Sequence, residues 1–124
     1  MFTIDNDMTI NLTRGDCAVL PLEVEIDEQS NYVFQVGDIV RITVVEKKNY
    51  ENVVLQKDFA IEEETEVINI ILTEEDTKFG EIISKPTTYW YEVVLNPETN
   101  PQTVIGYDDD GPKAFVIYPE GAEI

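Results

Sequence analysis

The sequence predicts an all-β protein, an antiparallel sandwich or barrel of about eight strands. Apolar and polar residues alternate through most of the chain. This two-residue period is typical of a β-strand with one buried face and one solvent-exposed face. Turn-forming residues recur roughly every ten residues. A parallel layout would need crossover helices, and the sequence leaves no room for them.

The predicted strands follow from alternation taken in chain order. They are Met8–Thr13, Leu20–Ile26, Asp38–Glu46, Val53–Phe59, Val67–Leu72, Thr87–Asn96, Gln102–Asp108 and Lys113–Tyr118. Turns rich in Gly, Asn, Asp and Pro separate them, at Arg14–Asp16, Gln29–Asn31, Lys47–Asn52, Asn96–Pro101 and Asp108–Pro112. We expect one domain over residues 1–124, with a ragged N-terminus at Met1–Asp7 and a polar tail at Pro119–Ile124.

One segment departs from the strand period. Thr73 is a capping residue, acidic residues follow it, and Lys78 precedes Gly80 in the order typical of a helix C-terminus. We therefore expect one short helical turn near 73–80, linking two strands, and a loop over 81–86.

The strongest strand is Thr88–Leu95. Its odd positions form a Tyr/Val/Leu face, whereas its even positions include Trp90 and Glu92 and continue to Asn96. Since Glu92 and Asn96 favour water, the odd face is assigned to the core and Trp90 to the outer face. An outward tryptophan is a candidate contact surface, unless a neighbouring segment of the same chain covers it. The expected core includes Leu20, Leu22, Val24, Val40, Ile42, Val44, Ile68, Ile70, Tyr91 and Val93.

Composition excludes several function classes. Lys+Arg 8 against Asp+Glu 26 gives a formal net charge of −18, so a basic face for nucleic acid or anionic lipid is not expected. The chain has no His and one Cys, which excludes the usual zinc sites, histidine-dependent catalysis and an intrachain disulfide framework. We expect no enzyme activity and no cofactor.

Location follows from the N-terminal sequence and the apolar runs. The start lacks a basic region followed by an apolar one, so a secretory signal is not expected. No apolar run approaches the ~20 residues that span a bilayer. We therefore expect a protein made in the cytoplasm.

Four motifs resemble functional sites, and each also has a simpler structural interpretation. Arg14-Gly15-Asp16 is expected to be a turn between strands rather than an integrin ligand. Asp108–Gly111 is either a hairpin turn or an adventitious cation site, because the EF-hand spacing is missing. The acid run Glu62–Glu66 is expected to be a wet turn rather than an acid–base pair. Cys17 has no histidine to activate it as a nucleophile.

The formal net charge of −18 is compatible with three functional roles. It can keep an edge-bearing β protein soluble, complement a basic partner, or imitate the phosphates of DNA. Acids are spread over nearly every turn and onto strand exteriors, as at Glu23 and Glu25. This dispersion favours the first two roles over mimicry.

Three segments in a fixed order resemble a known phage pattern. They are Met8–Asp16 followed by the strand Leu20–Ile26, then Phe34–Val44, and later Leu72–Asp76 with Tyr89-Trp90-Tyr91. Together they look like the N-terminal domain of tailed-phage upper baseplate proteins and related small phage and prophage virion proteins. The resemblance implies an immunoglobulin-like β-sandwich that acts as a non-enzymatic adaptor of the tail or baseplate.

The resemblance also sets the expected partners and location. These would be other virion proteins, through docking or self-association, in the virion. Because the baseplate proteins continue beyond this domain and the present chain stops at Ile124, a stand-alone virion or assembly protein is expected. Two alternatives stay open. One is an acidic decoy of a host DNA-binding protein, and the other is a carbohydrate-binding module in which Trp90 with Tyr50 or Tyr107 forms an aromatic platform.

Overall fold

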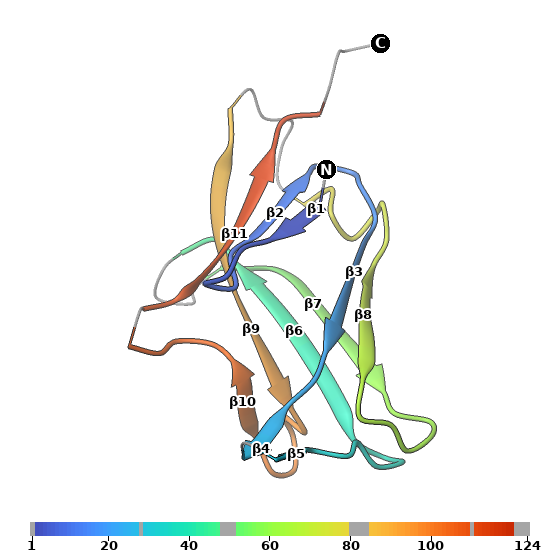
Figure 1. Ribbon diagram of the computed structural model, residues 1–124. Helices are drawn as coiled ribbons and strands as arrows, with labels where there is room; N and C mark the ends of the chain where they lie inside the picture. The colour runs from blue at the N-terminus through green and yellow to red at the C-terminus, as the bar shows by residue number, and fades with distance from the viewer. Residues whose placement is uncertain (1, 28, 48–51, 80–84, 110, 121–124) are drawn as a thin grey trace.

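The computed structural model describes the chain except for residues 1, 28, 48–51, 80–84, 110 and 121–124. This part of the chain is all-β, with eleven strands and no helix (Figure 1). The strands are β1 (Phe2–Ile4), β2 (Ile10–Thr13), β3 (Ala18–Leu22), β4 (Glu25–Asp27), β5 (Ser30–Asn31), β6 (Ile39–Val45), β7 (Val53–Ala60), β8 (Ile68–Leu72), β9 (Thr87–Leu95), β10 (Gln102–Ile105) and β11 (Lys113–Tyr118).

The larger sheet has seven strands in the order β1-β2-β11-β9-β6-β7, and β10 also pairs with β9. The long strand β9 accommodates three partners. β6 runs along one edge, while β11 and β10 share the other, with Lys113 opposite Tyr91 and Thr103 opposite Val94. β9, the strand whose pattern is strongest in the sequence, is therefore the central strand of this open sheet.

The sheet is mixed, so the expectation of a wholly antiparallel layout was wrong. β2 and β11 run parallel, with Ile10 opposite Phe115. A parallel pair needs a long connection, which is commonly a helix. Here the strands come from opposite ends of the chain, and the intervening domain serves as that connection.

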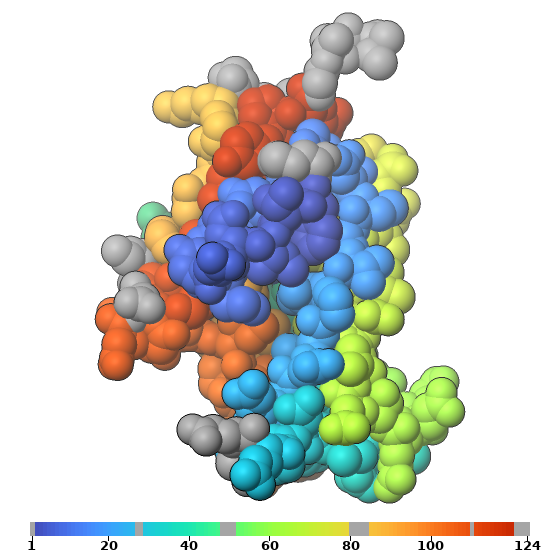
Figure 2. All heavy atoms as spheres, viewed as in Figure 1, coloured from blue at the N-terminus to red at the C-terminus, as the bar shows by residue number. Residues whose placement is uncertain are grey.

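A second layer, the antiparallel pair β3–β8, faces the large sheet across one hydrophobic core (Figure 1). Its even-numbered side chains are buried with the inward residues of β6, β9 and β11. Figure 2 shows the N-terminal strands, in dark blue, lying across the front of the molecule. All the expected core residues are buried except Val24, which is only partly buried.

Val24 packs against the core without being buried in it, because β3 ends at Leu22, whose partner Ile68 is the first residue of β8. Without a partner there, the chain turns into the small β4–β5 hairpin, and Ile26 is 64% exposed. The expected strand Leu20–Ile26 is thus two strands. A further strand, β1, forms within the segment expected to be ragged, because β2 offers it an edge.

The expected helical turn near 73–80 is a hydrogen-bonded turn in its described part. The Thr77 N–H donates to the Thr73 carbonyl (3.3 Å) and the Lys78 N–H to the Glu75 carbonyl (3.3 Å). Thr73 caps it as expected, since its hydroxyl accepts from the Asp76 N–H and the Asp76 carboxylate accepts from the Thr73 N–H. Gly80 lies outside the described residues.

The Arg14–Asp16 segment is a turn, as predicted. The Asp16 N–H donates to the Thr13 carbonyl (3.0 Å), and Gly15 has a φ of +86°. The Arg14 guanidinium donates to Glu120 (2.7 Å) and to the Lys78 carbonyl (2.9 Å). Its role is therefore to tie three separate segments together at one end of the sandwich.

Candidate functional site

Trp90 lies on the outer face of the large sheet, as the alternation predicts. It is half-buried, and the residues on either side of it, Tyr89 and Tyr91, are buried in the core. Across the sheet its neighbours are Val45 and Ala114. Val45 is only 1% exposed although it lies outside the core cluster. The chain itself therefore covers part of this outer face, and an interface role for Trp90 stays a prediction.

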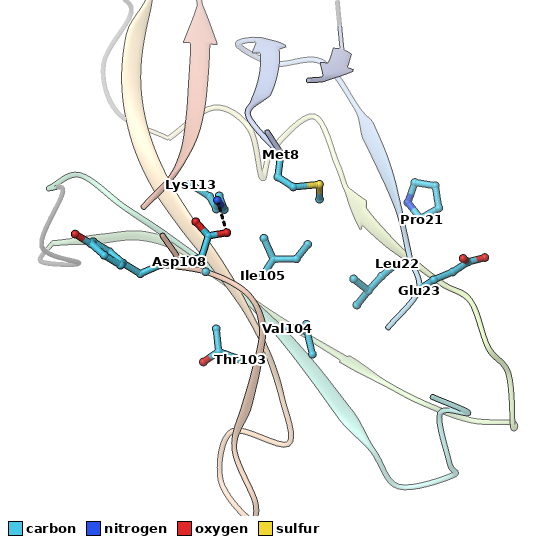
Figure 3. Close-up of a pocket in the computed structure, with 11 residues that line it drawn as sticks. Met8, Pro21, Leu22, Glu23, Thr103, Val104, Ile105, Asp108 and Lys113 are labelled. Carbon is cyan, nitrogen blue, oxygen red and sulfur yellow. Dashed lines mark ion pairs between the residues drawn. The ribbon is translucent and has the colours of Figure 1, made fainter. Parts of the chain in front are cut away.

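A cleft of about 430 Å³ opens between β3 and β10. We call it the β3–β10 cleft; Met8, Leu22, Val104 and Ile105 give it apolar walls (Figure 3). Within the described chain, β3 pairs only with β8, and β10 pairs only with β9. The cleft therefore lies between two strand edges that carry no further strand.

The charged groups that line this cleft are Glu23 and the ion pair between Lys113 and Asp108. Lys113 Nζ lies 2.8 Å from Asp108 Oδ2, with the lysine side chain 8% exposed and the carboxylate 55% exposed (Figure 3). A buried ammonium needs such a partner. The lining residues that the structure describes include no Ser, Cys or His.

The Met8 wall of the cleft is held in an unusual backbone conformation. Met8 has a φ of +71°, which costs a non-glycine residue about 1 kcal/mol. The Tyr91 hydroxyl donates to the Met8 carbonyl (2.6 Å), and the Met8 N–H donates to the Asp5 carbonyl (2.9 Å). The Asp7 carboxylate accepts from the Thr9 N–H (3.1 Å). Hydrogen bonds from the side chain of Thr9 and then from its backbone lower the pKa of Asp7. This network presents the Met8 side chain to the cleft.

A second opening lies on the other side of the sandwich, between β7 and β8. This β7–β8 groove has a volume of about 500 Å³. Phe59, Ile61 and Ile68 form its apolar floor, and Glu62 and Glu63 stand at its rim. The acid run is exposed, as predicted. Its place beside an apolar groove depends on how the two layers pack, which local sequence does not show.

Lys57 spans the two layers beside this groove. It occupies a core-facing position of β7, in phase with Leu55 and Phe59. Its ammonium donates to Asp76 Oδ2 (2.6 Å) and to the Ile71 carbonyl of β8 (3.0 Å). The sequence contains one indication of this role, because Lys57 stands at a strand position where the alternation predicts an apolar residue. Inward-pointing charges protect the edges of sheets from pairing with other chains.

The Lys57 pair also sets the ionisation of Asp76. Partial burial raises the pKa of Asp76, but the Lys57 ammonium and hydrogen bonds from Thr73 lower it by more. The Asp76 carboxyl group therefore stays ionised at pH values below the usual pKa of an aspartate. The ion pair between Lys57 and Asp76 persists in mild acid.

Lys57→Met is expected to lower the free energy of unfolding by about 1–2 kcal/mol, because Asp76 loses its cation and the Ile71 carbonyl loses a donor. Urea unfolding measures this change, and size-exclusion chromatography should show more self-association as the edge loses its charge. The matched control is Lys85→Met, an exposed lysine with the same charge change. Equal stability and elution of the two variants would contradict the role of Lys57.

The structure places the remaining candidate residues as follows. Asp108 and Gly111 form the predicted tight hairpin, with Gly111 at φ +92°. Within the described residues no three His, Cys, Asp or Glu side chains gather as a metal site; Asp110 lies outside them. Cys17 is exposed. Tyr107 is 70% exposed at the cleft, whereas Tyr50 lies outside the described residues.

Comparisons with known proteins return no match among family models, curated proteins or solved structures. The described chain contains no helix with the length and apolar character needed to span a membrane.

Proposed function

We propose that this chain is a non-enzymatic structural protein of a tailed-phage virion, an adaptor that docks other virion proteins. One feature of the fold carries the proposal. Two layers share one core, yet the described strands leave edges without a further strand on both sides, at the β3–β10 cleft and the β7–β8 groove. Such edges are templates for a strand of another chain.

The finer architecture and the setting rest on separate grounds. The packing of two sheets about one core supports an immunoglobulin-like sandwich. The virion setting rests on the ordered resemblance of Met8–Asp16, Phe34–Val44 and Tyr89–Tyr91 to phage baseplate domains.

Charge favours docking to a different protein over self-association. Ion pairs within the chain already engage Arg14, Arg41, Lys57, Lys78 and Lys113. Most of the acids that the structure describes are exposed, and two copies would each bring a formal charge of −18. Repulsion therefore opposes contact between copies, whereas a basic surface of another subunit attracts this chain.

Quantitative mass spectrometry of purified particles, compared with unassembled lysate, tests the proposal. The expected result is recovery in particles at a fixed multiple of the tail-protein copy number. Abundance in lysate with absence from particles would overturn it and leave the acidic decoy or an assembly factor as the better description.

A further inference from the structure

Resting on the proposed adaptor function, we infer that the β7–β8 groove binds an extended, cationic segment of a partner protein. The segment adds as a strand to the outer edge of β8. Its alternate apolar side chains contact the groove floor, while its lysines or arginines face the acidic rim. Three observations carry this assignment: the edge, the floor and the rim.

The outer edge of β8 carries no further described strand around Asn69, while Lys57 already occupies the neighbouring Ile71 carbonyl. Within the described chain β8 pairs only with β3, where Asn69 stands opposite Pro21. Proline has no N–H to donate, so Pro21 and Asn69 fit as a pair that forms no hydrogen bonds between the two strands. In such a pair the backbone N–H and C=O of Asn69 point away from β3. Ile71, two residues along, shares that direction, and its carbonyl accepts from Lys57 across the gap between the layers. The backbone of Asn69 and the Ile71 N–H therefore face the groove.

Three other edges, those of β3, β10 and β1, carry features that oppose strand addition. Pro21 removes a donor from the outer edge of β3, and β10 has a register shift between Thr103 and Ile105. β1 is only three residues long. The segment of β8 around Asn69 carries none of these features, and it borders the groove.

The floor of the groove is apolar and held in place. Ile61 and Ile68 are nearly buried, and Ile71 is 49% exposed. Phe34 and Thr65 exchange backbone hydrogen bonds of 2.8 and 3.2 Å, and the Ile61 N–H donates to the Asp38 carbonyl (2.9 Å). The loop that carries the rim is thereby preorganised, which reduces the entropy lost when a ligand binds.

The acidic rim of the β7–β8 groove favours a positively charged partner segment. Glu62, Glu63, Glu64 and Glu66 are exposed on this loop, and no cation in the described part of the chain forms an ion pair with them. A strand presents alternate side chains to one side, so cations at every second position can face the rim together. A second copy of this chain fits poorly, since it has 8 cations against 26 acids.

The probe is an acetylated and amidated peptide of about eight residues with alternating lysine and valine. Nuclear magnetic resonance titration of the full chain should give saturable shifts at residues 59–63 and 67–71. Glu62→Lys with Glu63→Lys should weaken binding about tenfold or more. The matched control, Glu25→Lys with Asp109→Lys, changes net charge equally at exposed positions away from the groove and should stay within about twofold.

Two further peptides separate strand addition from simple charge attraction. Methylation of alternate backbone nitrogens removes donors but keeps every charge, and it should abolish the shifts at residues 67–71. A glutamate–valine peptide should not bind. Equal binding of the methylated peptide, or equal weakening by both double variants, would overturn the inference.

Particle incorporation distinguishes this inference from the proposed function. If Glu62→Lys with Glu63→Lys enters particles as well as the control variant does, the groove assignment fails and the adaptor function stands. If the peptide binds as expected but the protein is absent from particles, the virion function fails and the groove assignment stands.

Discussion

Replacing Phe115 by alanine is expected to lower the free energy of unfolding by about 3–5 kcal/mol. Phe115 is fully buried in β11, the strand that joins the N-terminal pair β1–β2 to the rest of the large sheet. Its ring centroid lies 5.8 Å from that of Phe79 and 6.0 Å from that of Tyr91. Alanine removes both aromatic contacts and leaves a cavity that the surrounding strands cannot fill.

Urea unfolding followed by the fluorescence of Trp90 measures this loss. Val116→Ala is the matched control, because Val116 is the outward neighbour on the same strand and is only partly buried. Its cost should stay near 1 kcal/mol. Phe115→Leu, at about 1–1.5 kcal/mol, keeps the comparison measurable if the alanine variant is largely unfolded. Equal costs at positions 115 and 116 would contradict the role assigned to Phe115.

Asp38→Ala is expected to cost about 2–3 kcal/mol near neutral pH. The Asp38 carboxylate accepts from the Tyr32 hydroxyl (2.6 Å), the Gln35 N–H (2.9 Å) and the Asn96 side-chain amide (3.1 Å). Asn96 in turn accepts from the Ile39 N–H (2.8 Å). One carboxylate thus joins the loop before β6 to the turn after β9, and alanine leaves its donors without an acceptor.

The same carboxylate predicts a pH dependence. Partial burial raises the pKa of Asp38, but hydrogen bonds from Gln35, Tyr32 and Asn96 together lower it by more. With its pKa in the folded state below that of the unfolded chain, the carboxylate contributes its full stability above the ordinary value of about 3.9. That contribution is lost as pH falls through the folded pKa.

Urea unfolding of the natural chain and of Asp38→Ala at about pH 7, 5 and 3 tests whether the contribution of Asp38 to stability falls with pH. The stability difference between the natural chain and Asp38→Ala should be constant between the first two values and smaller at the third. Asp109→Ala, at an exposed carboxyl of the turn between Asp108 and Gly111, should change stability by less than about 0.5 kcal/mol throughout. A difference that grows as the pH falls would contradict the assignment.

Much of the secondary structure could be predicted because alternation is a local property. β6 and β9 have the faces that their sequences indicate, with Ile42, Tyr91 and Val93 inward. The break after Leu22 could not be predicted, because alternation continues to Ile26. It arises where β8 stops offering a partner, and that depends on a segment more than forty residues away.

The candidate site was less predictable for a related reason. The outward position of Trp90 was predictable from the alternation, and its interface role stays a prediction. Lys57 and Asn96 act through partners distant in sequence. The run Glu62–Glu66 shows its charge in the sequence but not its neighbours. Ile68 and Ile71 join it at the groove only when β8 packs across from β7.

The sequence by itself determined the all-β class, most strand positions, the inward faces and the excess negative charge. It also excluded chemistry that needs histidine. These properties follow from composition and from a period of two residues, which need no knowledge of distant partners. Tertiary structure alone decided the parallel β2–β11 pair, the edges that carry no further strand among the described residues, and the carboxylates that rim the groove. Pairing between distant strands depends on how whole layers bury their apolar faces, and local patterns do not encode it.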